Sequence, residues 1–208
     1  MIKREYKSYK QYIKHQLEKS MNSFQRKHVK SKWDEDKIKH SARFECLKDY
    51  ITAGKAICLA AKLGSEVEAL REFGFDAIGI DIAPEPPLVI YGDFHNIPFE
   101  DNTFDLVFTN SLDHVYDLNK VGLEIERVMK PDGYVLLVVH FGVFGSHESV
   151  RIDNIDELMA YLPNFSVIYS NLWEVHHKKR KGLDTSLSTV NRYEILLQLK
   201  EYVWTKKS

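Results

Sequence analysis

"AICLAAKLGSEVEAL" (56–70) is an apolar run that crosses one glycine and continues as an amphipathic helix. Its first part has the length and composition of a buried strand, and the apolar residues after Gly64 recur at helical spacing. In α/β proteins, a strand that leads through a tight turn into a helix is where nucleotide-like cofactors bind. This stretch therefore predicts an α/β fold and makes its turn the first candidate site.

Short apolar segments continue after this unit and alternate with helical patterns. We expect strands at 56–60, 77–81, 88–91, 105–109 and 134–139, and helices at 64–73, 117–130 and 153–162. Continuously apolar strands separated by helices indicate a parallel sheet that is covered on both faces. The segment "IAPEPP" (82–87) is too short and too rich in proline for a helix, so we expect an extended loop there.

The C-terminal part of the chain has a different pattern. "FSVIYS" (165–170) and "YEILLQL" (193–199) are two candidate strands with no helical pattern between them. Such strands can pair antiparallel, and we place the pair at one edge of the sheet. The segment "HHKK" (176–179) is then expected in the hairpin loop.

The segment before the first strand has a helical pattern. Within residues 6–21, aromatic and apolar residues recur at the spacing of one helix face: Tyr9, Tyr12, Ile13, Leu17 and Met21. After a polar stretch, Ser31 is expected to cap a second helix. We therefore divide the chain into an N-terminal helical arm (1–55) and an α/β domain (56–208).

Length and composition are those of an ordinary globular domain. The 208 residues are 44% apolar and 28% charged, which is enough to build one hydrophobic core. The two cysteines, Cys46 and Cys58, do not make a disulfide framework, so we expect a cytoplasmic location. The N-terminus has no apolar signal segment, and the longest apolar run (134–145) is too short to cross a bilayer, so no membrane association is expected.

Charge is distributed unevenly along the chain. Residues 1–40 contain twelve Lys or Arg and five Asp or Glu, whereas the remaining residues contain seventeen and twenty-five. A solvated basic helix face explains this surplus, and attraction of an anionic substrate is the alternative. Nucleic acid is the less favoured partner, because no signature of a nucleic-acid-binding module accompanies the charge.

Three further segments follow the first unit in a recognisable order. They are "AIGIDI" (77–82), "YGDFHNIPFEDNTFDLVFTNSLDHV" (91–115) and "EIERVMKPDGYVLL" (124–137). In order and spacing, the chain resembles the class I S-adenosylmethionine-dependent methyltransferases. The resemblance implies a Rossmann-like three-layer α/β/α sandwich, whose mostly parallel seven-stranded sheet ends in an antiparallel strand pair. It also implies S-adenosylmethionine (SAM) as the cofactor.

The turn at 60–64 departs from the pattern of that family. Where the family has G-x-G-x-G, this chain has Ala60, Ala61, Lys62 and Gly64, and Cys58 stands in place of the acid that ends the first strand. Glycine serves there because a Cβ would block close approach of the backbone to the ligand. Lys62 puts a cationic side chain beside a cofactor that is itself a sulfonium, unless its ammonium turns outward or meets the methionine carboxylate.

The resemblance assigns the remaining cofactor contacts. Asp81, followed by Ile82, would bind the ribose hydroxyls, Asp93 the adenine amino group and Phe94 the adenine ring, with Asn110 after the fourth strand. From the residues alone, the alternative for Asp81 is a helix-cap or turn aspartate, and the alternative for Asp93 is a turn residue. NAD also pairs with an acid at the end of the second strand, but no G-x-G-x-x-G is present.

Methyl transfer needs an aligned acceptor and, for a hydroxyl, a base. Sites in open α/β sheets lie at the carboxyl ends of strands, where His114 and His140 follow two of the predicted strands. Asp113 would orient His114 or act itself, and His95 is a weaker candidate. A structural, hydrogen-bonded role is the alternative for each histidine. No histidine spacing typical of zinc sites occurs, so we expect no metal.

The sequence thus predicts a SAM-dependent methyltransferase that acts on a small-molecule or glycan-type hydroxyl. The glycan part depends on a resemblance of "YKSYKQYIKHQ" and "TNSLDH" to a subgroup of bacterial methyltransferase-like proteins. In the family, the segment before the first strand often folds over the cofactor, so we expect the arm to be a lid on the acceptor side. The alternative is a methyltransferase fold that has lost its cofactor and serves as a binding module or partner subunit.

Overall fold

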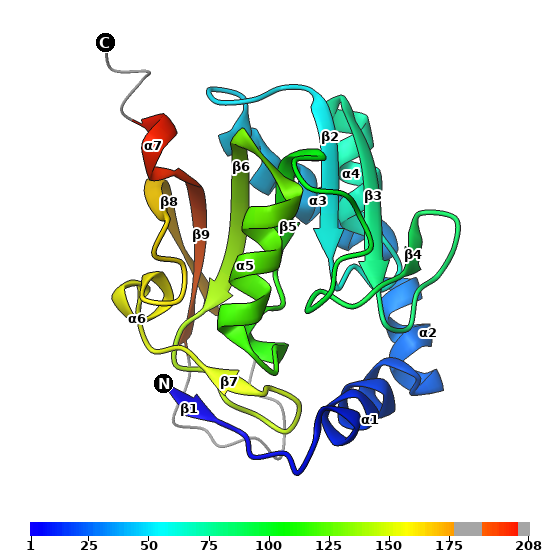
Figure 1. Ribbon diagram of the computed structural model, residues 1–208. Helices are drawn as coiled ribbons and strands as arrows, with labels where there is room; N and C mark the ends of the chain where they lie inside the picture. Colours follow the sequence, from blue (N-terminus) through cyan, green and yellow to red (C-terminus); the bar gives the residue numbers. More distant parts are fainter. Residues whose placement is uncertain (177–188, 204–208) are drawn as a thin grey trace.

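The computed structural model describes residues 1–176 and 189–203 (Figure 1). Its centre is a seven-stranded sheet in the order β4-β3-β2-β5-β6-β9-β8. The first five strands in this order are parallel: β4 (Val89–Tyr91), β3 (Phe75–Asp81), β2 (Gly54–Leu59), β5 (Phe104–Thr109) and β6 (Met129–His140). This confirms the mostly parallel sheet expected from the apolar segments.

The sheet is closed by the antiparallel pair β8 (Phe165–His176) and β9 (Thr189–Leu199). β9 lies between β6 and β8 and is antiparallel to both. The loop 82–88 joins parallel neighbours without a helix, as its prolines predict. The predicted hairpin at 176–179 lies, from residue 177 on, outside the described residues.

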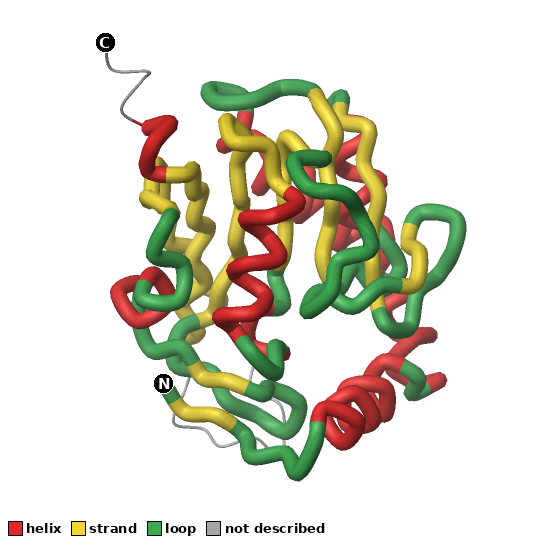
Figure 2. Tube along the Cα trace, in the orientation of Figure 1, coloured by secondary structure: helices red, strands yellow, loops and turns green. Residues whose placement is uncertain are grey.

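Helices cover both faces of the sheet (Figures 1 and 2). On one face lie α5 (Leu118–Val128) and α6 (Ile155–Met159), and on the other α3 (Trp33–Phe44) and α4 (Ser65–Phe73). Side chains alternate between the faces along each strand: Ile57 and Leu59 join the α5 core, whereas Ala56 and Cys58 join the core under α3 and α4. The predicted three-layer sandwich is confirmed.

The arm contains one more helix than the sequence predicts. It consists of α1 (Tyr9–Ser20), α2 (Ser23–Ser31), α3 and a short 3-10 turn, η1 (Glu45–Leu47). The prediction that Ser31 caps a helix is wrong, because Ser31 ends α2 and its hydroxyl donates to the carbonyl oxygen of His28. α2 has almost no buried face, and ion pairs of Arg26 and Lys30 with Glu85 tie it to the sheet domain.

Four short elements complete the described chain. The N-terminal strand β1 (Ile2–Lys3) pairs antiparallel with β7 (Val150–Arg151), and α7 (Lys200–Val203) follows β9. A further 3-10 turn, η2 (Leu112–His114), follows β5. α1 lies at the end of the sheet toward which the arrows of β2, β3 and β6 point, which is the carboxyl end of those strands (Figure 1). The arm therefore borders the edge of the sheet where α/β sites form.

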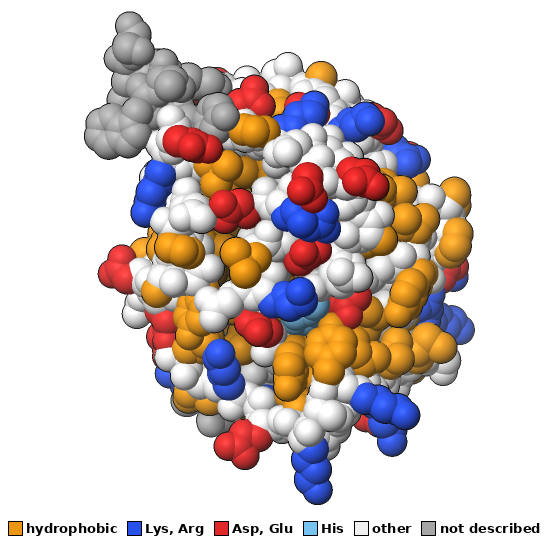
Figure 3. Space-filling model, in the orientation of Figure 1, with side chains coloured by type: hydrophobic (Ala, Val, Ile, Leu, Met, Phe, Trp, Pro, Cys, Tyr) orange, Lys and Arg blue, Asp and Glu red, His pale blue; other side chains and the backbone are white. Residues whose placement is uncertain are grey.

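Within the described residues, no helix combines the length and the hydropathy that crossing a bilayer requires. On the face shown in Figure 3, basic and acidic side chains are interspersed, so the basic surplus of residues 1–40 forms no continuous basic area there. Hydrophobic side chains gather over β4 and the neighbouring arm (Figure 3), where Tyr9, Ile90 and Tyr91 are exposed.

Candidate active site

A cavity lies between α1 and the carboxyl ends of β2, β3 and β5. Ala60, Lys62, Asp81, Ile82, Phe94 and His114, which the sequence marked as site residues, line it together with Tyr12, Gln16, Lys19, Ser20, Gly92 and Ser111. The arm and the sheet domain therefore form one site. The space left open in this cavity is about 50 Å³, which is room for only a few water molecules.

The turn after β2 has the backbone conformation of a glycine-rich loop, although only one of its residues, Gly64, is a glycine. The φ angles of Ala60, Lys62 and Gly64 are 58°, 49° and 86°, all in the left-handed region that glycine favours. These are the three positions matched to the family's glycines. An L-residue in this region costs about 1–2 kcal/mol, so the chain keeps Ala60 and Lys62 there against a conformational penalty.

Replacing Lys62 by glycine should therefore stabilise the fold. We expect Lys62→Gly to raise the free energy of unfolding by about 0.5–1 kcal/mol, because relief of the left-handed strain outweighs the entropy that glycine loses on folding. Urea denaturation measures the change. The matched control is Lys55→Gly in strand β2, where the exposed lysine has no such strain and the same substitution should destabilise. Loss of stability in both variants would contradict the prediction.

Asp81 anchors this turn and faces the cavity. Its Oδ2 accepts the backbone N–H of Lys62 at 3.0 Å, its Oδ1 accepts that of Ala83 at 2.7 Å, and the residue is 5% exposed. Asp81 therefore has the structural role in a turn that the sequence left as the alternative to ribose binding. Each carboxylate oxygen can accept more than one hydrogen bond, so acceptor capacity remains for a ligand in the cavity.

Gly64 packs closely against the neighbouring strand, which the sequence did not indicate. It is not among the cavity-lining residues, and a Cβ there would lie 2.9 Å from the side chains of Leu88 and Val89. The Cβ would therefore meet protein atoms at the start of β4, so this glycine lets the turn pack on the neighbouring strand. Contact of Gly64 with the cofactor stays a prediction. Ala61, between the two strained residues, is buried, and its backbone N–H donates a hydrogen bond to the carbonyl oxygen of Ile80.

Asp93 and Phe94 are adjacent in sequence but line different hollows. Phe94 lines the cavity, whereas Asp93 lines a neighbouring hollow with Tyr9, His95 and Tyr116. One Asp93 oxygen accepts the hydroxyl of Tyr9, and the other accepts the backbone N–H and the Nδ1–H of His95, both at 2.9 Å. Burial, and then the Asp93 carboxylate, raise the pKa of Tyr9. The adenine role of Asp93 stays a prediction and requires exchange of these partners.

The ring of His95 is fully engaged in structural contacts. Its Nδ1 faces Asp93, and its Nε2 accepts the backbone N–H groups of Tyr116 and Asp117 at 3.1 and 3.2 Å. His95 is 3% exposed. The structural alternative describes this histidine best.

The two histidines at strand ends have different surroundings. His114, in η2, lines the cavity. His140, at the end of β6, is not among the lining residues and accepts a hydrogen bond from Arg192 Nε at 2.8 Å. Asn110, also outside the lining, accepts the hydroxyl of Ser111 at 3.0 Å. The geometry thus separates the predicted candidates and leaves His114 as the histidine that faces the site.

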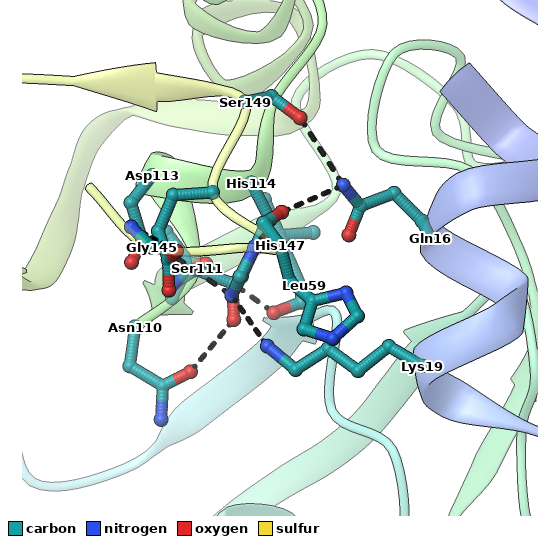
Figure 4. Close-up of polar contacts among 12 residues, drawn as sticks. Gln16, Lys19, Leu59, Asn110, Ser111, Asp113, His114, Gly145, His147 and Ser149 are labelled. Carbon is teal, nitrogen blue, oxygen red and sulfur yellow. Dashed lines mark hydrogen bonds and ion pairs between the residues drawn. The ribbon is translucent and has the colours of Figure 1, made fainter. Parts of the chain in front are cut away.

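His114 is surrounded by charged groups (Figure 4). Lys19 Nζ lies 3.1 Å from its Nε2, and its Nδ1 lies 3.0 Å from the carbonyl oxygen of His147. Asp113 Oδ1 is 3.8 Å from Nε2. A carboxylate oxygen of Asp113, a ring nitrogen of His114 and a carboxylate oxygen of Glu148 lie within 4.8 Å of one another. Burial lowers the pKa of His114 and raises that of Asp113, so a neutral imidazole is favoured.

Sequence reasoning expected the arm on the acceptor side but did not name Gln16 or Lys19 as site residues. Tyr12, Gln16 and Lys19 lie at i, i+4 and i+7, which is one face of α1. The apolar stripe predicted for this helix was only partly right, because the two buried residues of α1 are Tyr12 and Gln16, whereas Tyr9 and Met21 are exposed. A buried glutamine among tyrosines is a polar signal that an apolar periodicity count ignores.

The fold has the strand order and the strand–turn–helix unit expected of a class I methyltransferase architecture. Residues 59–137 match the family model described as a methyltransferase domain. Over that segment the chain is similar to the SAM-dependent methyltransferases, and SAM is the cofactor of that family.

Curated relatives match only in part. A sterol 24-C-methyltransferase of Schizosaccharomyces pombe is 43% identical over 68 residues, which is 32% of this chain and 16% of that protein. A sterol 4-C-methyltransferase of Caenorhabditis elegans is 31% identical over 88 residues, covering 34% of this chain and 26% of that protein. The chain thus spans a small part of the length of both relatives.

Solved structures match over most of the chain. The 1,6-didemethyltoxoflavin-N1-methyltransferase of Burkholderia thailandensis, solved with its substrate and S-adenosylhomocysteine, has a TM-score of 0.71 and 13% identity, covering 95% of this chain and 93% of that one. A SAM-dependent methyltransferase of Thermotoga maritima has a TM-score of 0.61 and 15% identity, covering 89% and 99%. At these identities the likeness concerns the fold.

Proposed function

We propose that this chain transfers the methyl group of SAM to a hydroxyl group of a small-molecule acceptor, with glycan-type hydroxyls as one such class. The observation that carries the proposal is that one cavity is lined both by the candidate cofactor-binding residues and by a candidate base. Asp81 and the left-handed turn lie on one side of it, and His114 lies on another. A cofactor site and a base that share one cavity can act on one bound pair of ligands.

The residues present fit the cofactor. The turn brings its backbone to the cavity at Ala60 and Lys62, Asp81 has acceptor capacity for two ribose hydroxyls, and Phe94 offers a ring for adenine. Lys62 and Lys19 are the cations available for a carboxylate. When bound, SAM supplies a methyl group that is already activated by its sulfonium.

The protein then has to position the acceptor, exclude water and accept a proton. Positioning by bound groups is the largest of these contributions, about 7–11 kcal/mol at best. His114 is a suitable proton acceptor, because burial lowers its pKa and keeps the imidazole neutral. The matched relatives act on sterols and on a toxoflavin precursor by name, which supports a small-molecule acceptor.

The arm (1–55) is proposed as the lid of the domain (56–208). α1 contributes Tyr12, Gln16, Lys19 and Ser20 to the cavity. A shift of α1 would therefore open or close the cavity. A closed lid would exclude water and complete the acceptor pocket.

Isothermal titration with SAM and with S-adenosylhomocysteine tests the cofactor part. We expect heat and a rise in melting temperature with both compounds, since binding to the folded state stabilises it. The alternative, a binding module that has lost the cofactor, is favoured by the lysine in a glycine position. No heat and no thermal shift at millimolar SAM would select that alternative.

A further inference from the structure

Lys19 and His114 form a pair whose hydrogen-bonding roles are determined by their partners. The ammonium of Lys19 is only a donor, so Nε2 of His114, at 3.1 Å, is the acceptor and carries no proton. The carbonyl oxygen of His147 is only an acceptor, so Nδ1 of His114, at 3.0 Å, carries the proton. The two contacts together select one neutral tautomer of His114, with the lone pair of Nε2 on the side of Lys19.

The arm holds this pair in place through several contacts (Figure 4). Gln16, one turn before Lys19 on α1, donates its amide to the carbonyl oxygen of His147 at 3.0 Å and to Ser149 Oγ at 3.1 Å. His147 O therefore accepts from both the arm and His114. His15 Nε2 lies 3.0 Å from the carbonyl oxygen of Ser146. α1 and the loop 141–149 thus fix Lys19 and His114 relative to each other.

We propose that Lys19 is a positioning residue for His114: it keeps this histidine a neutral Nδ1–H base at the cavity and makes the arm part of the acceptor site. The inference rests on the proposed function, because it gives the methyl acceptor a base and a neighbouring cation. Both residues line the cavity that contains Asp81.

This pair selects the chemistry of the acceptor. A hydroxyl that takes the place of the Lys19 ammonium at Nε2 would donate its O–H to Nε2, and its oxygen would accept from the displaced ammonium beside it. On proton transfer, the O–H bond breaks, the proton goes to Nε2, and the electron pair stays on the oxygen, next to the positive charge. An amine that enters as an ammonium ion would face a like charge at the same place. The site therefore suits an oxygen acceptor.

The charges around His114 come from four segments. Lys19 approaches from α1, Lys62 from the cofactor turn, Asp113 from η2 itself, and Glu148 with His147 from the loop 141–149. Burial and the two lysines lower the pKa of His114, whereas Asp113 raises it. Burial lowers the pKa of Lys19, and Lys62 lowers it further. Removal of the Lys19 charge should therefore raise the pKa of His114.

Imidazole NMR on the full chain tests this inference without cofactor or acceptor. In ¹⁵N-histidine-labelled protein, long-range ¹H–¹⁵N spectra from pH 5 to 9 report tautomer and pKa, and His114→Gln identifies the signals of His114. We expect the Nδ1–H tautomer and a pKa below the ordinary value in the wild type. Lys19→Met should raise that pKa by about one to three pH units, whereas Lys19→Arg should leave it low.

Lys14→Met on the exposed side of α1 is the matched control and should leave the His114 signals unchanged. An Nε2–H tautomer in the wild type would overturn the inference by itself, even if the Lys19 variants failed to fold. A pKa that stays the same in folded Lys19→Met would also overturn it. Absence of SAM binding in the titration would refute the proposed function and leave this NMR result unaffected, so the two failures are distinguishable.

Discussion

Asp81→Ala is expected to weaken SAM binding at least 100-fold. The carboxylate faces the cavity and would bind two ribose hydroxyls through charge-assisted hydrogen bonds, each worth about 1.5–3 kcal/mol. Every 1.4 kcal/mol corresponds to about tenfold in affinity. The substitution also removes the acceptor of the Lys62 and Ala83 N–H groups, so the cofactor turn loses its anchor. Isothermal titration at a temperature where the variant is folded measures the loss.

Asp76→Ala is the matched control for this variant. Asp76 lies in the same strand, β3, and its side chain is exposed, so its removal should leave SAM affinity unchanged. Asp81→Asn should fall between the two, because its amide keeps one oxygen acceptor. If folded Asp81→Ala binds SAM within threefold of the wild type, the ribose assignment is wrong.

The sheet could be predicted from sequence because its signals are local. β2, β3, β5 and β6 are apolar runs that the structure extends by a few residues, and the prolines of 82–87 correctly exclude a helix. α2 could not be predicted, since it lacks an apolar face and is held by ion pairs to Glu85, far away in sequence. The pairing of β1 with β7 is likewise set by distant partners.

The candidate site was predictable to the extent that it lies in the cofactor turn and at strand ends. Asp81, Phe94 and His114 were marked for that reason and do line the cavity. The position of the arm over the site was expected only from the family resemblance, and the lining residues Gln16 and Lys19 were not predictable, because no spacing rule reports which side chains of α1 meet the turn. The contact of Tyr9 with Asp93 is of the same kind, since it joins residues whose separation in sequence carries no pattern.

Gly64→Val is expected to destabilise the fold by about 3 kcal/mol or more. Valine would have to adopt a φ near 86°, which costs about 1–2 kcal/mol for an L-residue. Its Cβ would also lie 2.9 Å from the side chains of Leu88 and Val89, and overpacking of this kind typically costs a further 1–3 kcal/mol or so. The free energy of unfolding from urea denaturation measures the sum.

Gly142→Val separates the two costs. Gly142 also has a left-handed φ, of 78°, but a Cβ there would meet nothing within 4 Å. This variant should therefore lose only the conformational part, about 1–2 kcal/mol, and the difference between the two variants reports the contact with the start of β4. If Gly64→Val loses no more stability than Gly142→Val but no longer binds SAM, Gly64 acts on the ligand. The role that its surroundings indicate, packing of the turn against Leu88 and Val89, would then be wrong.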